Sequence, residues 1–365
     1  MEKKKLPIGI IALAAIFSIL TLLAWFGPKE ETSDWERRPL ARFPEVSGPS
    51  IASGKFMADF ENYTLDQFPL RDSFRTVKSM FHYYVLGQRD NNAIYLTQGH
   101  AAQLEYPLDE KSVQHALDQF QLVYDLYLKD KDTAVYATVV PDKGFYLAEE
   151  NGYLAMDYEA LFAMVQAGMP WAAYVDITDC LEIADYYTTD THWRQEKLLP
   201  AAKKLCDAMG AAAPKAEDFT PTLLEQPFYG VYYGQAALPL APDAITLMES
   251  PVLEQCSVYN YVTDSYGPVY DMEKLAGKDP YEVYLSGSQS LLRIENPNAK
   301  THRELIIFRD SFGSSLAPLL VQDYAAVTLI DIRYIAPQLL GRYVDFEGKD
   351  VLFAYSTLVL NRSLI

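Results

Sequence analysis

Residues 304–313 read ELIIFRDSFG, an apolar run that meets a turn of small and polar residues. A short apolar run of this kind predicts a buried strand, and we expect a helix to follow at 314–324. The alternation continues with a predicted strand at 326–330, a helix at 334–343 and a strand at 351–355. Strands that alternate with helices at this spacing indicate a parallel sheet with right-handed crossovers. The C-terminal part of the chain therefore predicts an α/β fold.

The middle of the chain shows the same rhythm. Residues 109–128 carry apolar side chains at three- and four-residue steps, which predicts an amphipathic helix. Residues 133–140 form a β-branched run that indicates a buried strand. We expect a further helix at 158–169, a strand at 171–177 and a helix at 195–209. The predicted fold is thus a parallel sheet flanked by helices.

The region from about 212 to 300 departs from this rhythm. It contains many prolines and tyrosines and only short strand-like runs, such as residues 258–262. We interpret it as a β-rich insertion in the α/β domain.

The N-terminus predicts a membrane segment. Residues 6–26 carry no charge, and about 20 apolar residues suffice to span a bilayer as a helix. Lys3, Lys4 and Lys5 precede this run and should stay in the cytoplasm, which places the rest of the chain outside. A cleaved signal peptide is the alternative. The apolar run is longer than is usual in a signal peptide and no clear small-x-small cleavage site follows it, which favours an uncleaved signal-anchor at 1–27.

The segment that follows the membrane segment predicts a linker. Residues 28–50 are polar and contain four prolines, which indicates a semi-extended stalk. The extracytoplasmic domain then occupies 51–365. At its start, residues 53–84 show helical spacing that Pro69 divides into two helices.

Composition narrows the classes of partner. The net charge of -18 argues against nucleic acid and gives no electrostatic reason to bind an anionic surface. Exposed members of the 27 tyrosines would suit sugars, although most tyrosines are half-buried core residues. The three cysteines, Cys180, Cys206 and Cys256, lie too far apart in sequence for a metal knuckle or a redox pair.

Ser311 is the candidate nucleophile. It follows a predicted strand and precedes a predicted helix, so its hydroxyl should lie at the carboxyl edge of the sheet. Amide groups at the start of that helix could bind an oxyanion there. The alternative is that Ser311 only caps the helix.

A candidate base lies far upstream, in the sequence TDTHW at 189–193. A serine hydroxyl is a poor nucleophile until a base removes its proton, and His192 is suited to that task. Asp190 could fix the tautomer of the imidazole and stabilise its charged form. A zinc site on Asp190 and His192 is an alternative, but the sequence has no further ligands at metal spacing. Asp190, His192 and Ser311 together predict acyl transfer through a serine.

The sequence resembles the DHHW family and the alginate O-acetyltransferases, over about residues 35–355. The segments ERRPLARFP (36–44), FENY (60–63) and DQFPLRD (66–72) are similar to the N-terminal signature of DHHW proteins. The order Asp190, His192, then Ser311 is the reverse of that in SGNH hydrolases and resembles the permuted SGNH-hydrolase-like domain of these families. We expect a structural role for the N-terminal signature, with Arg71 and Asp72 forming a cap or an ion pair.

The resemblance implies a fold and a set of site residues. The fold would be SGNH-hydrolase-like, a three-layer arrangement similar to flavodoxin. Ser311 would be the nucleophile, His192 the base and Asp190 the orienting acid, with no cofactor and no metal. Arg333, in a segment at 330–334 that also looks like the family, could face the site. The chain reads Asp-Thr-His-Trp where the family name implies Asp-His-His-Trp, and Arg309 stands where SGNH enzymes often have Gly.

Three further site residues are candidates. Lys143 follows the predicted strand at 133–140 and could contact substrate, because ligand sites lie at the carboxyl ends of strands in α/β sheets. A solvated lysine is the alternative. Trp193 is a second candidate for substrate binding, and Gly230 could supply an oxyanion-hole amide.

The implied function is a membrane-anchored extracytoplasmic serine O-acetyltransferase or acetylesterase. Its substrate would be a cell-envelope or secreted polysaccharide, and by analogy a membrane-bound protein would deliver the acetyl group. The alternative is a non-catalytic glycan-binding or assembly protein that retains the fold.

Overall fold

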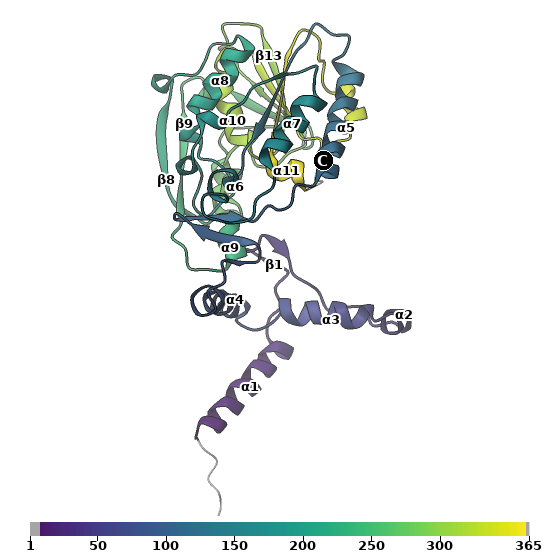
Figure 1. The fold of residues 1–365 in the computed structure, drawn as a ribbon, viewed down its shortest axis with the longest axis vertical. Coiled ribbons are helices and arrows are strands. Elements are labelled where there is room, and N and C mark those ends of the chain that lie inside the picture. The colour runs from purple at the N-terminus through teal and green to yellow at the C-terminus, as the bar shows by residue number, and fades with distance from the viewer. Residues whose placement is uncertain (1–7, 363–364) are drawn as a thin grey trace, which may run out of the picture. The chain divides into compact units, whose positions relative to one another are not determined.

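The computed structural model describes residues 8–362 and residue 365 (Figure 1). The described chain forms two compact units. The N-terminal unit contains the residues up to Asn92 together with Tyr233–Pro239, and the sheet unit contains Ala93–Tyr232 and Leu240–Ile365.

An eight-stranded sheet organises the sheet unit, in the order β11-β10-β12-β14-β13-β15-β6-β7. Strands β14, β13, β15, β6 and β7 are parallel, as predicted, whereas β12, β10 and β11 are antiparallel. The strands are β6 (Ala134–Val140), β7 (Ala173–Tyr174), β10 (Ser257–Asn260), β11 (Ser265–Gly267), β12 (Leu291–Glu295), β13 (Glu304–Arg309), β14 (Ala326–Ile330) and β15 (Asp350–Ser356). The predicted α/β fold is confirmed, and the sheet is mixed because strands from the predicted insertion extend one edge.

Helices cover both faces of this sheet, which gives three layers (Figure 1). Ile307 of β13 packs in a core cluster with α8 (Leu199–Met209) and α10 (Gly313–Leu320). Its neighbour Ile306 packs in a second cluster with α5 (Glu110–Tyr127) and α7 (Tyr158–Gly168). Successive side chains of a strand point to opposite faces, so one strand supplies both cores.

Side-chain caps define where several of these helices begin. Asp109 accepts hydrogen bonds from the amides of Lys111 and Ser112 at the start of α5. Ser356 caps α11 (Thr357–Asn361), and Asp142 caps α6 (Lys143–Leu147). Each cap supplies an acceptor for an amide that has no partner within the helix.

The predicted insertion is rich in strands. β8 (Thr220–Phe228) and β9 (Asp243–Glu249) form an antiparallel pair, and α9 (Val231–Ala236) lies between them in the sequence. β4 (Ile94–Thr97) and β5 (His100–Gln103) form a second antiparallel pair, upstream of α5. Short 3-10 helices complete the unit: η2 (Thr178–Cys180), η3 (Ile183–Asp185), η4 (Gln195–Lys197), η5 (Ala216–Asp218), η6 (Leu253–Gln255), η7 (Met272–Ala276), η8 (Pro280–Val283), η9 (Val321–Asp323) and η10 (Pro337–Arg342).

Four predicted elements differ from the structure. The helix expected at 314–324 ends as α10 at Leu320 and is followed by the 3-10 helix η9. The helix expected at 334–343 is the 3-10 helix η10, and the strand expected at 171–177 is reduced to the two residues of β7. The helix expected at 195–209 is divided, because η4 precedes α8 and Pro200 lies in the first turn of α8. Proline is well tolerated at that position.

The N-terminal unit contains mostly helices. They are α1 (Ile8–Phe26), α2 (Gly48–Ala52), α3 (Lys55–Asp66), α4 (Arg71–Met80) and the π-helix η1 (Phe81–Val85), with short strands β1 (Thr32–Ser33), β2 (Arg38–Pro39) and β3 (Asp90–Asn91). Pro69 separates α3 from α4, as the sequence predicts. Residues 51–92, which we expected to begin the domain that contains the sheet, group here with the N-terminal segment.

The segment predicted as a stalk is held by ion pairs. Arg38 donates two hydrogen bonds to the Asp66 carboxylate, at 2.6 and 2.8 Å. Arg71 lies 2.5 Å from Glu36 and 3.4 Å from Asp72, so the expected structural contact between Arg71 and Asp72 is present.

α1 is the one helix among the described residues that is long and apolar enough to cross a membrane, and none of it is buried. A signal sequence has the same features. The predicted cytoplasmic tail, including Lys3, Lys4 and Lys5, lies outside the described residues.

Candidate active site

The turn after β13 fixes the position of Ser311. The Asp310 carboxylate accepts hydrogen bonds from the amide of Phe312 at 3.0 Å and from the amide of Ser356 at 2.8 Å. The first bond shapes the turn, and the second ties the turn to the end of the neighbouring strand β15. Ser311 therefore lies between β13 and α10 at the carboxyl edge of the sheet, as the sequence predicts.

The imidazole of His192 lies beside this serine. Its Nε2 atom is 2.8 Å from the Ser311 Oγ atom, and its Nδ1 atom is 2.6 Å from the Asp190 Oδ1 atom. Asp190 is fully buried and also accepts hydrogen bonds from the amides of His192 and Val231, at 3.0 and 2.9 Å. The structure thus brings together the three residues that the sequence selected, in the order carboxylate, imidazole, hydroxyl.

Tyr281 holds the plane of the imidazole. Its ring stacks on His192 with a centroid distance of 3.8 Å and an interplanar angle of 8°. Its hydroxyl lies 2.8 Å from the Ser315 Oγ atom, and burial raises the pKa of the phenol, which therefore stays neutral. The sequence analysis did not identify Tyr281, because no motif distinguishes it from the other tyrosines of the insertion.

Trp193 supports the site from within the core. The side chain is fully buried, and the indole N–H donates to the Phe312 carbonyl at 3.2 Å and to the Ser315 Oγ atom at 2.9 Å. The expectation that Trp193 binds substrate is therefore corrected, because no part of its side chain is exposed to a ligand. Trp193 instead fixes the first turn of α10 behind Ser311.

Gly230 lies against the backbone of the Asp190 loop. A Cβ atom at this position would collide with Asp190 and with the Thr189 carbonyl. The Gly230 amide donates to the Thr189 Oγ1 atom at 3.0 Å and is not available to an oxyanion. The expectation of an oxyanion role is corrected, and the glycine is required here for close approach.

Lys143 is buried beneath the same loop. Its Nζ atom donates to the carbonyls of Ala101 and Thr188, at 2.5 and 3.1 Å, and lies 5.2 Å from the centre of the Tyr232 ring. Burial lowers the pKa of the ammonium to about 7, although Asp190 and Asp243 oppose the shift. Neither the expected substrate contact nor the solvated alternative is correct, because only 2% of the residue is exposed.

Asp243 anchors the loop that carries Asp190 through the two residues before it. Its carboxylate accepts the amide and the hydroxyl of Thr188, both at 2.7 Å, and the amide and the hydroxyl of Thr189, at 2.8 and 2.6 Å. Four hydrogen bonds therefore fix the two residues that precede Asp190. The sequence analysis did not identify Asp243, which is separated from the loop by more than fifty residues.

Arg333 lies at the carboxyl edge of the sheet, just after β14. Because β13 and β14 are parallel, with Phe308 opposite Ile330, this is the edge that carries Ser311. Asp331 accepts two hydrogen bonds from the Arg333 guanidinium, at 2.8 and 2.6 Å. Burial opposes the charged form of Arg333, but the Asp331 carboxylate raises its pKa. A role for Arg333 in substrate binding stays a prediction.

Arg309 is a fully buried cation next to the turn that carries Ser311. It donates from Nη1 to the Asp310 carbonyl at 3.2 Å and to the Ser314 Oγ atom at 3.1 Å. Burial lowers its pKa, and nearby Asp331 opposes that shift. Its Nε and Nη2 atoms have no hydrogen-bond partner among the described residues.

The fold is similar to that of several solved structures. A DHHW family protein from Eubacterium siraeum has 22% sequence identity and a TM-score of 0.59, over 74% of this chain and 93% of that chain. PatB1 from Bacillus cereus has 15% identity and a TM-score of 0.58, over 74% of this chain and 98% of that chain. The expected resemblance to the DHHW family is confirmed at the level of the fold.

The remaining comparisons give weaker similarity or no match. The O-acetyltransferase domain of Pseudomonas putida AlgJ matches with 15% identity and a TM-score of 0.45, over 74% of this chain and 92% of that chain, and this similarity is too low to support an argument. No protein-family profile and no curated protein sequence matches the chain.

Proposed function

We propose that this protein is a serine O-acetyltransferase or acetylesterase that acts on a polysaccharide outside the cytoplasm. The observation that carries the proposal is the hydrogen-bonded series from Asp190 through His192 to Ser311, at 2.6 and 2.8 Å. These distances lie within the range required for proton transfer between a nucleophile and its base, ~2.6–3.2 Å.

The geometry supports a two-step reaction. The Ser311 Oγ atom attacks the carbonyl carbon of an acetyl ester, and its proton passes to the His192 Nε2 atom. The imidazolium returns this proton to the leaving oxygen, so that an alcohol departs and an acetyl-serine remains. His192 then takes a proton from the hydroxyl of an acceptor, which attacks the acetyl-serine. As the acetylated acceptor departs, the imidazolium returns this proton to the Ser311 Oγ atom, which restores Ser311 and the neutral imidazole. A sugar hydroxyl as acceptor gives a transferase, and water gives an esterase.

The negative charge that forms on the carbonyl oxygen needs donors. The amide of Phe312 donates to Asp310, and the amide of Gly313 donates to the Asp310 carbonyl at 3.1 Å. We assign the amide of Ser311, in the same turn, as one oxyanion donor. The structure assigns no side-chain donor.

The proposal also specifies the group that is transferred, the acceptor and the side of the membrane on which the domain lies. The similarity of the Asp-Thr-His-Trp and Asp-Ser-Phe motifs to alginate O-acetyltransferases supports an acetyl group and a polysaccharide acceptor. The apolar helix α1 after three lysines supports a single-pass anchor with the domain outside the cytoplasm. A membrane protein that supplies the acetyl group is included by analogy alone.

Labelling with a sulfonyl fluoride tests the nucleophile. PatB1 has been solved with a sulfonyl adduct, which suggests this reagent class for a protein of the same fold. Incubation of the full chain with phenylmethylsulfonyl fluoride should add one sulfonyl group to the peptide that contains Ser311, as measured by mass spectrometry. Ser311→Ala should prevent this labelling and the hydrolysis of p-nitrophenyl acetate, whereas the exposed control Ser265→Ala should leave both unchanged. Equal labelling and hydrolysis in Ser311→Ala would overturn the proposal.

A second candidate function is glycan binding without catalysis. Tyrosine rings cluster on the β10–β11 hairpin, where Tyr259 lies 4.8 Å from Tyr261 and 5.1 Å from Tyr266 between ring centroids. Tyr266 is 64% exposed, and aromatic faces of this kind suit sugars. A wild-type protein that hydrolyses no ester, and whose Ser311→Ala variant binds glycan as well as the wild type, would favour this function.

A further inference from the structure

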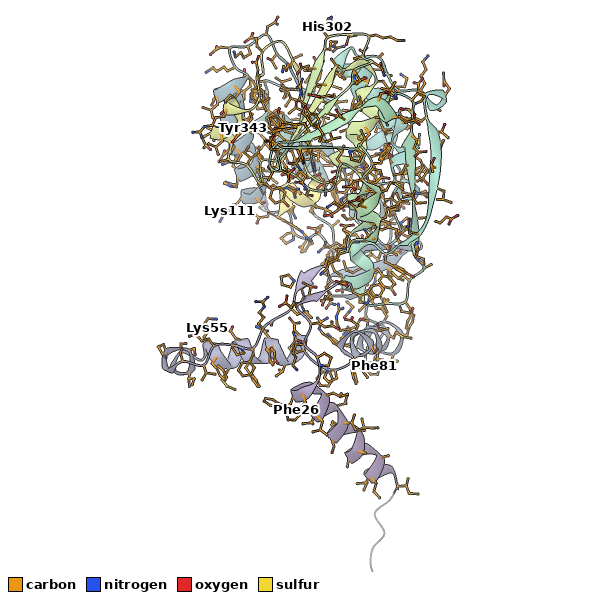
Figure 2. All side chains as sticks on the ribbon, turned by 180° about the vertical axis from the view of Figure 1, so that it is seen from behind. Phe26, Lys55, Phe81, Lys111, His302 and Tyr343 are labelled. Atoms are coloured by element: carbon orange, nitrogen blue, oxygen red, sulfur yellow. The ribbon has the colours of Figure 1, made fainter. Side chains whose placement is uncertain are left out.

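The helix α4 and the π-helix η1 carry an apolar stripe that faces outward. The stripe consists of residues at three- and four-residue steps, which lie on one side of a helix: Leu70, Phe74, Val77, Phe81 and Tyr84. Their exposed fractions are 67%, 47%, 63%, 49% and 71%, in that order. Figure 2 labels Phe81 where α4 passes into η1. A soluble surface rarely presents so large a contiguous apolar area.

The polar side of the same helix faces the interior of the N-terminal unit. Arg71 and Arg75 form ion pairs with Glu36, at 2.5 and 3.2 Å. Ser79 is 1% exposed and accepts a hydrogen bond from Asn91 at 2.8 Å. These contacts fix the rotation of the helix about its axis. The helix cannot turn its apolar stripe inward without breaking them, so the stripe stays exposed on the surface of the N-terminal unit.

The charge around the stripe indicates an anionic environment. Residues 70–89 contain four basic side chains, Arg71, Arg75, Lys78 and Arg89, and one acidic side chain, Asp72. Glu36 pairs with Arg71 and Arg75 inside the unit, and Lys78 and Arg89 are the exposed cations of this segment. The whole chain carries -18, so this is a basic segment in an acidic protein. The sequence analysis gave no electrostatic reason to bind an anionic surface, because a net charge does not reveal a local reversal.

A groove beside the stripe is also lined by both apolar and basic side chains. Its volume is about 550 Å³, and its lining includes the apolar side chains of Leu65, Phe68 and Phe74, the cation of Lys78, and the ion-paired groups of Glu36, Arg71 and Arg75. Apolar walls next to the exposed ammonium group of Lys78 match the chemistry of a phospholipid, whose phosphate adjoins its acyl chains.

The stripe is also continuous with the candidate membrane helix. A pocket of about 360 Å³ lies between the C-terminal half of α1 and α3, lined by Phe17, Leu20, Trp25, Phe60 and Phe68 among others. Phe68 lines both this pocket and the groove beside α4. A bilayer that surrounds α1 up to Phe26 would therefore reach the segment that begins α4.

We propose that α4 and η1 lie in the outer surface of the bilayer that contains α1, with the apolar stripe among acyl chains and the exposed cations Lys78 and Arg89 among anionic lipid headgroups. Basic amphipathic helices bind membranes in this orientation. The inference goes beyond the catalytic proposal and rests only on its membrane anchor. It makes the protein a two-point membrane binder, with one spanning helix and one interfacial helix.

Spin labels on the full chain test the proposal. The three native cysteines are replaced by alanine, and a nitroxide is attached at Val77→Cys, at Leu13→Cys in α1 or at the exposed aqueous control Glu225→Cys in β8. Each protein is reconstituted in vesicles of phosphatidylcholine with phosphatidylglycerol. Collision rates with oxygen, which enters lipid, and with a nickel chelate, which stays in water, are then measured by electron paramagnetic resonance.

The proposal predicts that the ratio of oxygen to nickel collisions at Val77 is several-fold higher than at Glu225 and approaches that at Leu13. Omission of phosphatidylglycerol should lower the ratio at Val77 and leave Leu13 unchanged. A water-like ratio at Val77 with a lipid-like ratio at Leu13 would overturn the interfacial helix and leave the anchor intact. Water-like ratios at both positions would overturn the anchor as well. Low rates with both reagents at Val77 would show that a second copy covers the stripe, and would also overturn the proposal.

A second measurement avoids the cysteine replacements. The native chain is reconstituted with a phosphatidylglycerol analogue that carries a photoreactive diazirine in its acyl chain, and cross-linked peptides are mapped by mass spectrometry. Cross-links in peptides that contain residues 70–84 support the proposal. Cross-links confined to α1 would contradict it.

Discussion

The helices α4 and α5 are both amphipathic, but α5 buries its apolar side whereas α4 exposes it. α5 buries Val113, Leu117 and Phe120 against the sheet and exposes its polar side. α4 buries the polar residue Ser79 and exposes Val77 and its apolar neighbours. Periodicity in a sequence therefore predicts a helix and its apolar side, but not whether the protein or another medium covers that side. The same contrast separates the two units, since the sheet unit buries polar groups to build a site and the N-terminal unit exposes apolar groups.

The largest expected effect is the loss of ester hydrolysis when a residue of the candidate triad in the sheet unit is replaced. His192→Ala should reduce hydrolysis of a small acetyl ester about as much as Ser311→Ala, because the members of a triad act as a unit. Asp190→Asn should reduce hydrolysis less, by up to about 10⁴-fold. The substitution keeps the shape of the side chain but removes its charge and changes the tautomer of the imidazole. Steady-state kinetics measures these losses. Retention of wild-type kcat/KM in His192→Ala would mean that the imidazole takes no part in the reaction.

A matched pair of truncations compares the two helices directly. Leu117→Ala in α5 should lower the free energy of unfolding by about 2–5 kcal/mol, because it leaves a cavity in the core. Val77→Ala in α4 should change it by less than about 0.5 kcal/mol in detergent, because the side chain is exposed there. Urea denaturation in detergent measures both. A comparable loss in the two variants would show that the α4 stripe packs against protein.

Asp243 tests whether the buried carboxylate positions the Asp190 loop. Asp243→Asn keeps the shape but turns an amide NH₂ toward threonine donors, so we expect a loss of about 1–3 kcal/mol of stability. We also expect kcat to fall while KM stays within error, because Asp243 contacts Thr188 and Thr189 and not the substrate. The exposed control Glu225→Gln should change neither quantity. An unchanged kcat in a destabilised Asp243→Asn would limit its role to stability.

A further expected effect is a pH dependence of stability that comes from Lys143. The folded pKa of about 7 lies below the ordinary value of 10.5, so between these pH values the unfolded chain binds a proton that the folded chain does not. The stability contribution of this group should therefore rise with pH from about 7 toward 10.5, by at most about 1.4 kcal/mol per pH unit, and stay constant below 7. Lys143→Met should remove this slope. Urea titrations of both proteins from pH 6 to pH 10 would show parallel curves if the lysine stays protonated.

Local sequence patterns predicted the residues of the candidate triad, because each has a functional group suited to acyl transfer. The apolar run before Ser311 predicted the strand and the turn, and the Asp-x-His spacing predicted the oriented imidazole. Their juxtaposition could be predicted only through the resemblance, because 119 residues separate His192 from Ser311. Tyr281 and Asp243 were missed because their contacts depend on how the insertion folds back, and no local pattern encodes that path.

The sequence was less informative about the direction of side chains. Trp193, Gly230 and Lys143 were selected because they lie near the motifs or after a strand, and the structure places all three beside or beneath the site. Each faces the interior, where Trp193 and Lys143 support the loops and Gly230 makes room for Asp190. Position along the chain determined proximity to the site, and packing determined which atoms a ligand can reach.

The hydrogen bond from the Ser356 amide to Asp310 has a consequence for biosynthesis. Asp190, His192 and Ser311 are all made before β15, yet the hydrogen bond that ties the Ser311 turn to the neighbouring strand forms only when the end of β15 is in place. A growing or truncated chain that stops before Asp350 contains every reacting group and lacks the strand that aligns the nucleophile. Under the proposed function, the protein should therefore stay inert during translation and become active only when the last strand of the sheet has joined.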